Sequence, residues 1–258
     1  MTLNHVRRGA GEPLLLIHGI GGEWRSWEPL IDRLAAQRDV VAIDMPGFGG
    51  SARLRPGTRP TARALAEAIA EFVRAEVSAD PVDVGGHSLG GWTALELAKL
   101  GVARRVVAVA PAGFWTRAEA AYGRTALRWT AWLVRRAPGL LSRGYERPGT
   151  RALLAGGQFG HPRRVEPDDL RRMGEVLAAA PGWDDTLQAT TRDRFSGADE
   201  IQAPVTIMWG TRDRLLLPRQ AARAEAEVPG AALIRLHGAG HFAHWDEPDA
   251  VLEALLRR

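Results

Sequence analysis

The chain has 258 residues, of which 45% are hydrophobic, so it is long enough to bury a large core within one domain that carries an insertion. It contains no Cys, which excludes disulfides and thiolate metal sites and is compatible with a reducing compartment. The formal net charge is +4 with Lys99 as the single Lys, and the whole excess lies between Gly113 and Asp199.

We interpret this localised positive charge as the solvated face of an Arg-rich segment, with attraction of an anionic substrate as the alternative. The segment lacks the interleaved basic and aromatic residues that favour nucleic acid. Near the N-terminus the only apolar run is Leu14 to Ile17, and His18-Gly19 follows it at once. We therefore expect neither a signal peptide nor a membrane span, and we predict a cytoplasmic protein.

Short apolar runs and helical spacing alternate along most of the chain. Uninterrupted apolar runs are typical of strands covered on both faces, and apolar positions that recur every three to four residues predict helices. The expected strands are residues 3–7, 14–17, 40–43, a segment that begins at Val82, 106–109, 205–209 and 232–236. The expected helices are residues 27–37, 61–77, 89–100, one that begins near Pro218, and 248–256.

A serine stands at the corner between a predicted strand and a predicted helix, in Gly86-His87-Ser88-Leu89-Gly90. A sharp turn of this kind projects the hydroxyl into a site, provided that its flanks are small enough for strand and helix to cross closely. Gly86 and Gly90 meet that need. The turn also puts the Leu89 N–H at the positive end of the following helix, where it would stabilise an oxyanion.

A second glycine-rich loop, His18-Gly19-Ile20-Gly21-Gly22, follows the strand at residues 14–17. Such a loop leaves backbone amides unpaired and able to point into a cleft, although a simple turn is the alternative.

The serine turn resembles the nucleophile elbow of the α/β-hydrolase family, and the likeness extends over about residues 3–112 and 201–257. The resemblance implies that the Ile20 N–H, or that of Gly21, is a second oxyanion donor beside Leu89. Residues 44–51 look like the family's Asp-x-Pro-Gly-x-Gly-x-Ser loop. We interpret this loop as structural, with Asp44 accepting hydrogen bonds from nearby loop amides.

The family's catalytic order is serine, then acid, then histidine. Asp213 follows the strand at residues 205–209, and His241 lies in a Gly-His loop after the strand at residues 232–236. The resemblance therefore implies a triad of Ser88, Asp213 and His241.

His237 and His244 are the competitors for the role of base, and we favour His241. A metal site made by these three histidines is disfavoured, because Gly238 and Gly240 break the helix that would align the ligands. We expect no metal and no cofactor.

Helical patterns replace the strands between Phe114 and Ser196, where the family inserts a helical lid. We expect an α/β-hydrolase core with a mostly parallel sheet at residues 1–112 and 200–258, and a lid at residues 113–199. The aromatic residues of the lid would shape an apolar pocket or bind the lid to the core. The expected pocket residues are Gly21, His87, Trp115, Trp129, Trp132 and Phe242.

The resemblance implies a serine hydrolase that cleaves a carboxylic ester or thioester of a small to medium, largely apolar molecule through an acyl-enzyme. A serine at the elbow excludes the dehalogenases and epoxide hydrolases of this fold, which use Asp there. Carbon–carbon bond hydrolysis and cofactor-free perhydrolase chemistry stay open, although His87 departs from the Asn that usually precedes the serine of carbon–carbon hydrolases. A non-catalytic binding protein that retains the fold is the alternative from another class.

Overall fold

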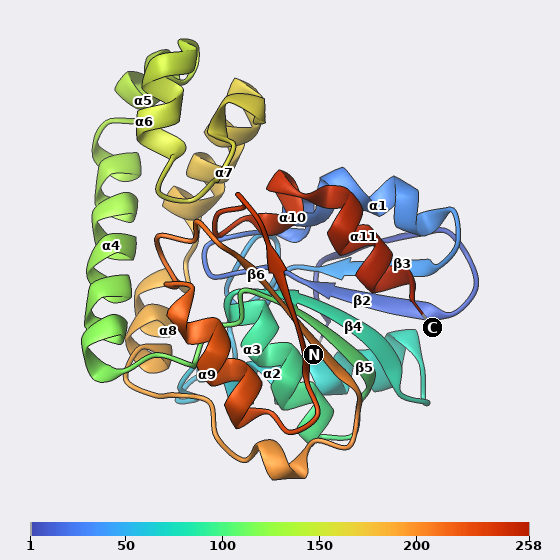
Figure 1. Ribbon diagram of the computed structural model, residues 1–258. Coiled ribbons are helices and arrows are strands. Elements are labelled where there is room, and N and C mark those ends of the chain that lie inside the picture. Colours follow the sequence, from blue (N-terminus) through green and yellow to red (C-terminus); the bar gives the residue numbers. More distant parts are fainter. Residues whose placement is uncertain (1, 258) are drawn as a thin grey trace.

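A computed structural model describes residues 2–257. Its centre is a seven-stranded sheet with the order β1-β3-β2-β4-β5-β6-β7 (Figure 1). All neighbouring strands are parallel except β1, which pairs antiparallel with β3 at one edge. The strands are β1 His5–Arg8, β2 Pro13–Ile17, β3 Asp39–Ile43, β4 Val82–His87, β5 Ala103–Val109, β6 Val205–Gly210 and β7 Ala232–Leu236.

Helices cover both faces of this sheet, which explains why its inner strands are apolar on both sides. In β2, Leu15 and Ile17 pack into one core cluster, whereas Leu14 and Leu16 pack into the other. One cluster includes α2 Ala62–Phe72, α3 Leu89–Lys99 and α9 Arg219–Glu227. The other includes α1 Glu28–Ala35, α10 Ala243–Asp246 and α11 Pro248–Leu256.

Five helices and no strand lie between β5 and β6, within residues 113–199 of the described chain. They are α4 Arg117–Arg136, α5 Pro138–Tyr145, α6 Pro148–Ala155, α7 Pro167–Ala179 and α8 Trp183–Thr190. We call residues 113–199 the helical insertion. In Figure 1, α4 stands beside the core, and α5, α6 and α7 project beyond the sheet.

The first helix of the insertion is tied to the core by Glu119. A capping box with Thr116 starts α4, because the Thr116 hydroxyl accepts from the Glu119 N–H while the Glu119 carboxylate accepts from the Thr116 N–H. The same carboxylate pairs with Arg219 and Arg223 of α9. The beginning of the insertion is therefore anchored to α9, one of the helices that cover the sheet.

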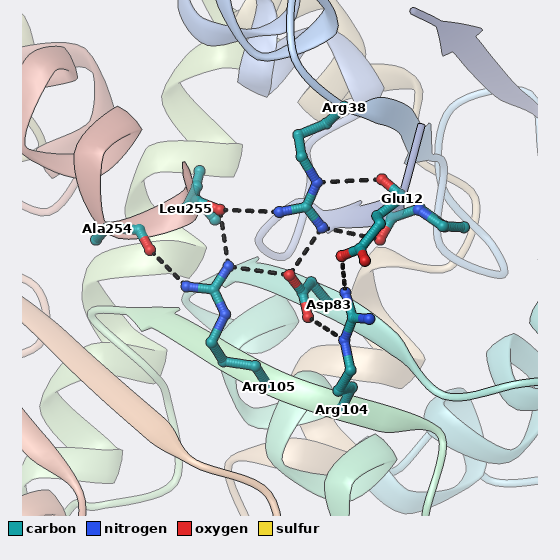
Figure 2. Close-up of polar contacts among 8 residues, drawn as sticks. Glu12, Arg38, Asp83, Arg104, Arg105, Ala254 and Leu255 are labelled. Atoms are coloured by element: carbon teal, nitrogen blue, oxygen red, sulfur yellow. Dashed lines mark hydrogen bonds and ion pairs between the residues drawn. The ribbon is translucent and has the colours of Figure 1, made fainter. Parts of the chain in front are cut away.

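Ion pairs centred on Asp83 lie at the amino end of β4, in the middle of the sheet (Figure 2). The Asp83 carboxylate receives hydrogen bonds from Arg38, Arg104 and Arg105 at 2.7 to 3.0 Å. Arg105 also donates to the carbonyls of Ala254 and Leu255, which satisfies the carboxyl end of α11. Burial acts to raise the pKa of Asp83, but the three arginines outweigh it and hold that pKa below its ordinary value.

The predicted fold is confirmed, and two elements, β7 and α11, have the predicted bounds. The predicted helix at residues 61–77 is shorter, because α2 ends at Phe72 and continues as a π-helical turn. The predicted core segments begin at residue 1 and end at residue 258, and these two residues lie outside the described chain. Among the described residues, no helix has the length and apolar character needed to cross a bilayer.

Candidate active site

Ser88 occupies a strained turn between β4 and α3. Its φ of 56° and ψ of −117° lie in a region that non-glycine residues rarely adopt. The two flanking glycines permit this turn. A Cβ at Gly86 would lie 2.2 Å from the Gly90 carbonyl oxygen, and a Cβ at Gly90 would lie 2.3 Å from the carbonyl oxygen of Ile17. The turn thus requires glycine at both positions, as the sequence predicts.

Asp213 is held by the loop that follows β6. Its Oδ1 accepts the N–H groups of Leu215 and Leu216 at 2.9 and 2.8 Å. This leaves Oδ2 free to accept from His241 Nδ1 at 2.8 Å, and both side chains are almost fully buried. The carboxylate is therefore oriented before any substrate arrives, and it fixes the proton of His241 on Nδ1.

The loops that carry Asp213 and His241 are joined to each other. The N–H groups of Thr211 and Arg212 donate to the carbonyls of Leu236 and Ala239, and the Gly238 N–H donates to the Thr211 hydroxyl. The close approach depends on Gly210, where a Cβ would lie 2.2 Å from the Gly240 carbonyl oxygen.

Ser88 and His241 border the same cavity. Within residues 2–257, the Ser88 hydroxyl makes no hydrogen bond, which leaves it able to turn toward a substrate or toward the imidazole. The structure thus places Ser88 and His241 at one cavity and joins His241 to Asp213 by a hydrogen bond.

His87 and His244 form a buried support beneath His241. The ring centroid of His87 lies 4.7 Å from that of His241 and 4.6 Å from that of His244. His87 Nε2 donates to the His241 carbonyl at 3.0 Å, and His244 Nε2 donates to the Ser26 carbonyl at 3.0 Å.

Both supporting histidines are neutral, because burial disfavours the charged imidazolium. Burial lowers the pKa of His244 to about 3. Burial, followed by the neighbouring His244 and His241, lowers the pKa of His87 well below its ordinary value. The Nδ1 atoms of both rings are buried and have no hydrogen-bond partner within residues 2–257.

The loop after β2 carries Ile20, which borders the cavity at Ser88. The Gly19 carbonyl accepts hydrogen bonds from His18 Nδ1 at 2.6 Å and from the Gly22 N–H at 3.1 Å. His18 donates from Nδ1 because its Nε2 already accepts the Met45 N–H. In a planar trans peptide the N–H points opposite to the C=O, so the Ile20 N–H is directed away from these donors.

Neither candidate oxyanion donor is used elsewhere. The Ile20 N–H donates to no acceptor within residues 2–257. The Leu89 N–H opens α3 and has no intrahelical acceptor.

Asp44 stabilises a loop and does not take part in the site. Its carboxylate accepts from the N–H groups of Trp24 and Gly50 and from the side chain of Asn4. The prediction that this acid is structural is confirmed.

Two cavities border Ser88, and the larger of them has a volume of about 150 Å³. Apolar side chains of the helical insertion form much of its wall, including Leu127, Phe159, Leu170, Met173, Leu177 and Trp183. Three charged residues, Glu23, Arg25 and Arg172, also border it. Burial raises the pKa of Glu23, although Arg25 and Arg172 lie nearby and oppose this shift.

Four of the six residues expected in the substrate pocket border a cavity at Ser88. Gly21, His87 and Phe242 line the larger cavity, and Trp115 lines a smaller one that Ser88 also borders.

Trp129 and Trp132 lie outside both cavities, contrary to the sequence expectation. They are 63% and 52% exposed and border a groove on the outer face of α4. The residues of α4 that face inward are smaller: Ala120, Gly123, Leu127, Ala131 and Val134. The helical period therefore overrides side-chain hydrophobicity at these two positions.

The arginines of the insertion give little support to an anionic substrate. Arg172 is the only one of them, within the described chain, that borders the larger cavity. It is paired with Glu28 at 2.7 Å and with Asp169 at 3.0 Å, so its charge is already compensated.

A contact between the insertion and the histidine loop was not predicted from the sequence. The carboxylate of Asp246 accepts the N–H groups of Gly160, His161 and Gly240 at 2.7 to 2.8 Å. The Phe242 N–H donates to the Gln158 carbonyl. No local pattern marks these partners, because they are about 85 residues apart in the sequence.

Comparisons with known proteins identify the family of the chain. A sequence model described as "Alpha/beta hydrolase family" matches residues 14–254. The chain belongs to the alpha/beta hydrolase family.

The chain also resembles a named protein over its whole length. It is 31% identical to the dihydrolipoyllysine-residue acetyltransferase component of the acetoin cleaving system of Cupriavidus necator, and the match covers 100% of the chain and 66% of that relative. The chain therefore spans slightly less than two thirds of the length of this relative.

Solved structures of two other proteins share the fold. A thermophilic esterase from Thermogutta terrifontis superposes with a TM-score of 0.72 at 22% identity, covering 98% of this chain and 91% of the esterase. A meta-cleavage product hydrolase superposes with a TM-score of 0.75 at 19% identity, covering 98% and 92% of the two chains.

Proposed function

We propose that the protein is a serine hydrolase that cleaves carboxylic esters or thioesters of small to medium, largely apolar molecules through an acyl-enzyme. The observation that carries this proposal is the buried hydrogen bond between His241 Nδ1 and Asp213 Oδ2, on a ring that shares a cavity with Ser88. This bond leaves Nε2 of His241 unprotonated and able to act as a base.

In the first half of the reaction, Ser88 Oγ attacks the carbonyl carbon and gives its proton to His241 Nε2. The carbonyl oxygen becomes an oxyanion, which the N–H groups of Ile20 and Leu89 stabilise. The bond to the leaving oxygen or sulfur then breaks, and His241 gives the proton to that atom. Asp213 balances the charge of the imidazolium while it exists.

In the second half, water attacks the acyl-enzyme and His241 takes its proton. The bond between the acyl carbon and Ser88 Oγ breaks, and the same proton returns to Ser88. The products are a carboxylic acid and an alcohol or thiol, so no external reductant or cofactor enters the balance.

Turnover of 4-nitrophenyl butyrate tests this proposal. The wild type should release 4-nitrophenol with a burst, and Ser88→Ala should lower kcat by about 10³-fold or more. Asp213→Asn should lower kcat by on the order of 10³ to 10⁴ while the protein stays folded, because the amide does not fix the same imidazole tautomer. Equal turnover by the folded wild type and Ser88→Ala would contradict the proposal.

Carbon–carbon hydrolysis and perhydrolysis are separated from ester hydrolysis by substrate. A vinylogous 1,5-diketone that is cleaved faster than any ester would favour the first, and peroxyacid formation from acetate and hydrogen peroxide would favour the second. Tight retention of a ligand by a folded wild type without turnover of any of these substrates would favour a binding protein.

A further inference from the structure

Ser88 borders two cavities of unequal size. The larger has a volume of about 150 Å³ and the smaller about 30 Å³. Ser88 and Ile20 border both of them, so a carbonyl carbon bound to Ser88 can send one substituent into each. His241 borders only the larger cavity, and Leu89 borders only the smaller.

This asymmetry decides which part of an ester occupies which cavity. The leaving atom must receive its proton from His241, so the leaving group has to extend on the side of that imidazole. The acyl chain stays bonded to Ser88 and extends on the other side. We propose that the smaller cavity is an acyl pocket for groups of two to four carbons and that the larger cavity holds a bulkier apolar alcohol or thiol; this assignment rests on the proposed function.

The size of the smaller cavity sets the length of the acyl chain. At about 30 Å³ the smaller cavity has one fifth of the volume of the larger one at about 150 Å³, so it takes the shorter of the two substituents of the ester.

The walls of the smaller cavity offer almost no free polar group. Thr190 is the last residue of α8, and Thr191 follows it. Their hydroxyls donate to the carbonyls of Thr186 and Leu187, respectively, which lie one helical turn earlier. Trp115 Nε1 donates to the Asp193 carbonyl. These residues therefore present methyl groups and a ring face to the cavity, which suits a hydrocarbon chain.

One charged residue, Arg124, borders the smaller cavity. It also borders the open groove on the outer face of α4. A long side chain in this position can bury its aliphatic part and keep its charge in water. The pocket is therefore suited to an unsubstituted short chain.

The wall of the smaller cavity comes partly from the core and partly from α4 and α8 of the insertion. Ala112, Trp115, Leu187 and Leu216 are each at most 8% exposed and belong to the main core cluster. Close-packed core side chains yield little to an extra methylene. The limit on acyl length should therefore be sharp.

Two isomeric esters test the orientation directly. Hexyl acetate and ethyl hexanoate have the same formula and similar leaving alcohols, but the long chain lies on opposite sides of the carbonyl. We expect kcat/KM, measured by titration of the released acid, to be about tenfold or more higher for hexyl acetate, since each accommodated methylene is worth about fourfold. A preference for ethyl hexanoate, or equal values, would overturn the proposal.

Gly123 offers a variant that shortens the pocket without a clash. It lies inside α4 and borders the smaller cavity, and an added Cβ would meet no atom within 4 Å. Ala also favours a helix more than Gly does, so Gly123→Ala should fold. We expect its ratio of kcat/KM for 4-nitrophenyl butyrate over acetate to fall by about fivefold or more.

Gly174→Ala is the matched control. Gly174 lies inside α7 and borders the larger cavity, where a Cβ would contact Val134 at 3.4 Å. Its butyrate-to-acetate ratio should stay at the wild-type value. A fall in this control equal to that in Gly123→Ala would overturn the acyl-pocket assignment.

The two proposals fail in different ways. If Ser88 is the nucleophile and esters turn over, but long acyl chains are preferred, the pocket assignment is wrong and the proposed function stands. If the folded wild type hydrolyses none of these esters, the proposed function fails and the pocket assignment falls with it.

Discussion

Asp246 of α10 accepts a hydrogen bond from the Gly160 N–H of the helical insertion at 2.7 Å. The same carboxylate accepts from the Gly240 N–H, next to the proposed base His241, at 2.8 Å. A Cβ at Gly160 would lie 1.9 Å from the Gly238 carbonyl oxygen, so the two segments are in direct backbone contact. The insertion and the histidine loop therefore form one packed unit.

Replacing Asp246 with Asn should loosen this unit. An amide has one acceptor oxygen, and its NH₂ would face N–H groups, so at least one buried N–H loses its partner. We expect a loss of unfolding free energy on the order of 3 kcal/mol, measured in urea, and a lower kcat because His241 is held less firmly.

Glu247→Gln is the matched control for Asp246→Asn. Glu247 is the next carboxylate along the chain, but it is 39% exposed and its partner His161 lies 3.7 Å away. Its change in stability should be close to zero. Equal effects of the two substitutions would contradict the role given to Asp246.

The neutral His244 should make the fold sensitive to acid. Its pKa is about 3 in the folded chain, against an ordinary value of 6.5. Below about pH 6.5 the unfolded chain takes up a proton at this position and the folded chain does not, so stability is lost as the pH falls toward 3. The slope is about 1.4 kcal/mol per pH unit for this one group.

His244→Phe tests this linkage by urea unfolding between pH 7 and 4. The variant should take up about one proton fewer than the wild type on unfolding in acid. Its stability should therefore depend less steeply on pH. The variant should still lose some stability in acid, because the pKa values of His18 and His87 are also lowered by burial. An unchanged slope in the variant would mean that His244 is protonated in the folded chain.

The buried ion pairs around Asp83 should matter for stability and not for catalysis. The side chains of Asp83 and Arg38 are each 7% exposed, so Asp83→Asn leaves a buried guanidinium without its counter-charge. We expect a loss of about 3 to 5 kcal/mol of unfolding free energy. Because Asp83 lies at the opposite end of β4 from Ser88, the kcat/KM of the folded variant should stay at the wild-type value.

Asp32→Asn is the control for a solvent-exposed pair with the same chemistry. Arg8 and Asp32 lie 2.6 Å apart, but their side chains are 46% and 81% exposed. Water screens this pair, so the substitution should change stability little. A loss as large as that of Asp83→Asn would show that burial is not the deciding factor.

Local sequence patterns predicted the fold and the order of the site residues. The elbow, the glycine-rich loop after β2 and the strand ends before Asp213 and His241 each have short-range signatures, since glycine spacing and apolar runs act within a few residues. Parallel strands bring their carboxyl ends to the same edge of the sheet, so residues that follow different strands are predicted to lie near one another.

The arrangement of the insertion was beyond such patterns. Trp129 and Trp132 were expected to line the pocket because they are large and apolar, yet the structure buries the small residues of α4 and exposes both rings. Two of the three hydrogen bonds of Asp246 in the short α10 depend on tertiary contacts across about 85 residues. The two unequal cavities at Ser88 are lined by residues from several distant segments, so no single segment encodes them.

Labelling with a fluorophosphonate is the most direct test that Ser88 is an activated nucleophile. The folded wild type should gain one adduct by intact mass, and peptide mapping should place it on Ser88. Ser88→Ala should gain none, and His241→Ala should react at least about 100-fold more slowly, because the hydroxyl has lost its base. An unlabelled folded wild type, or an adduct on another residue, would contradict the account.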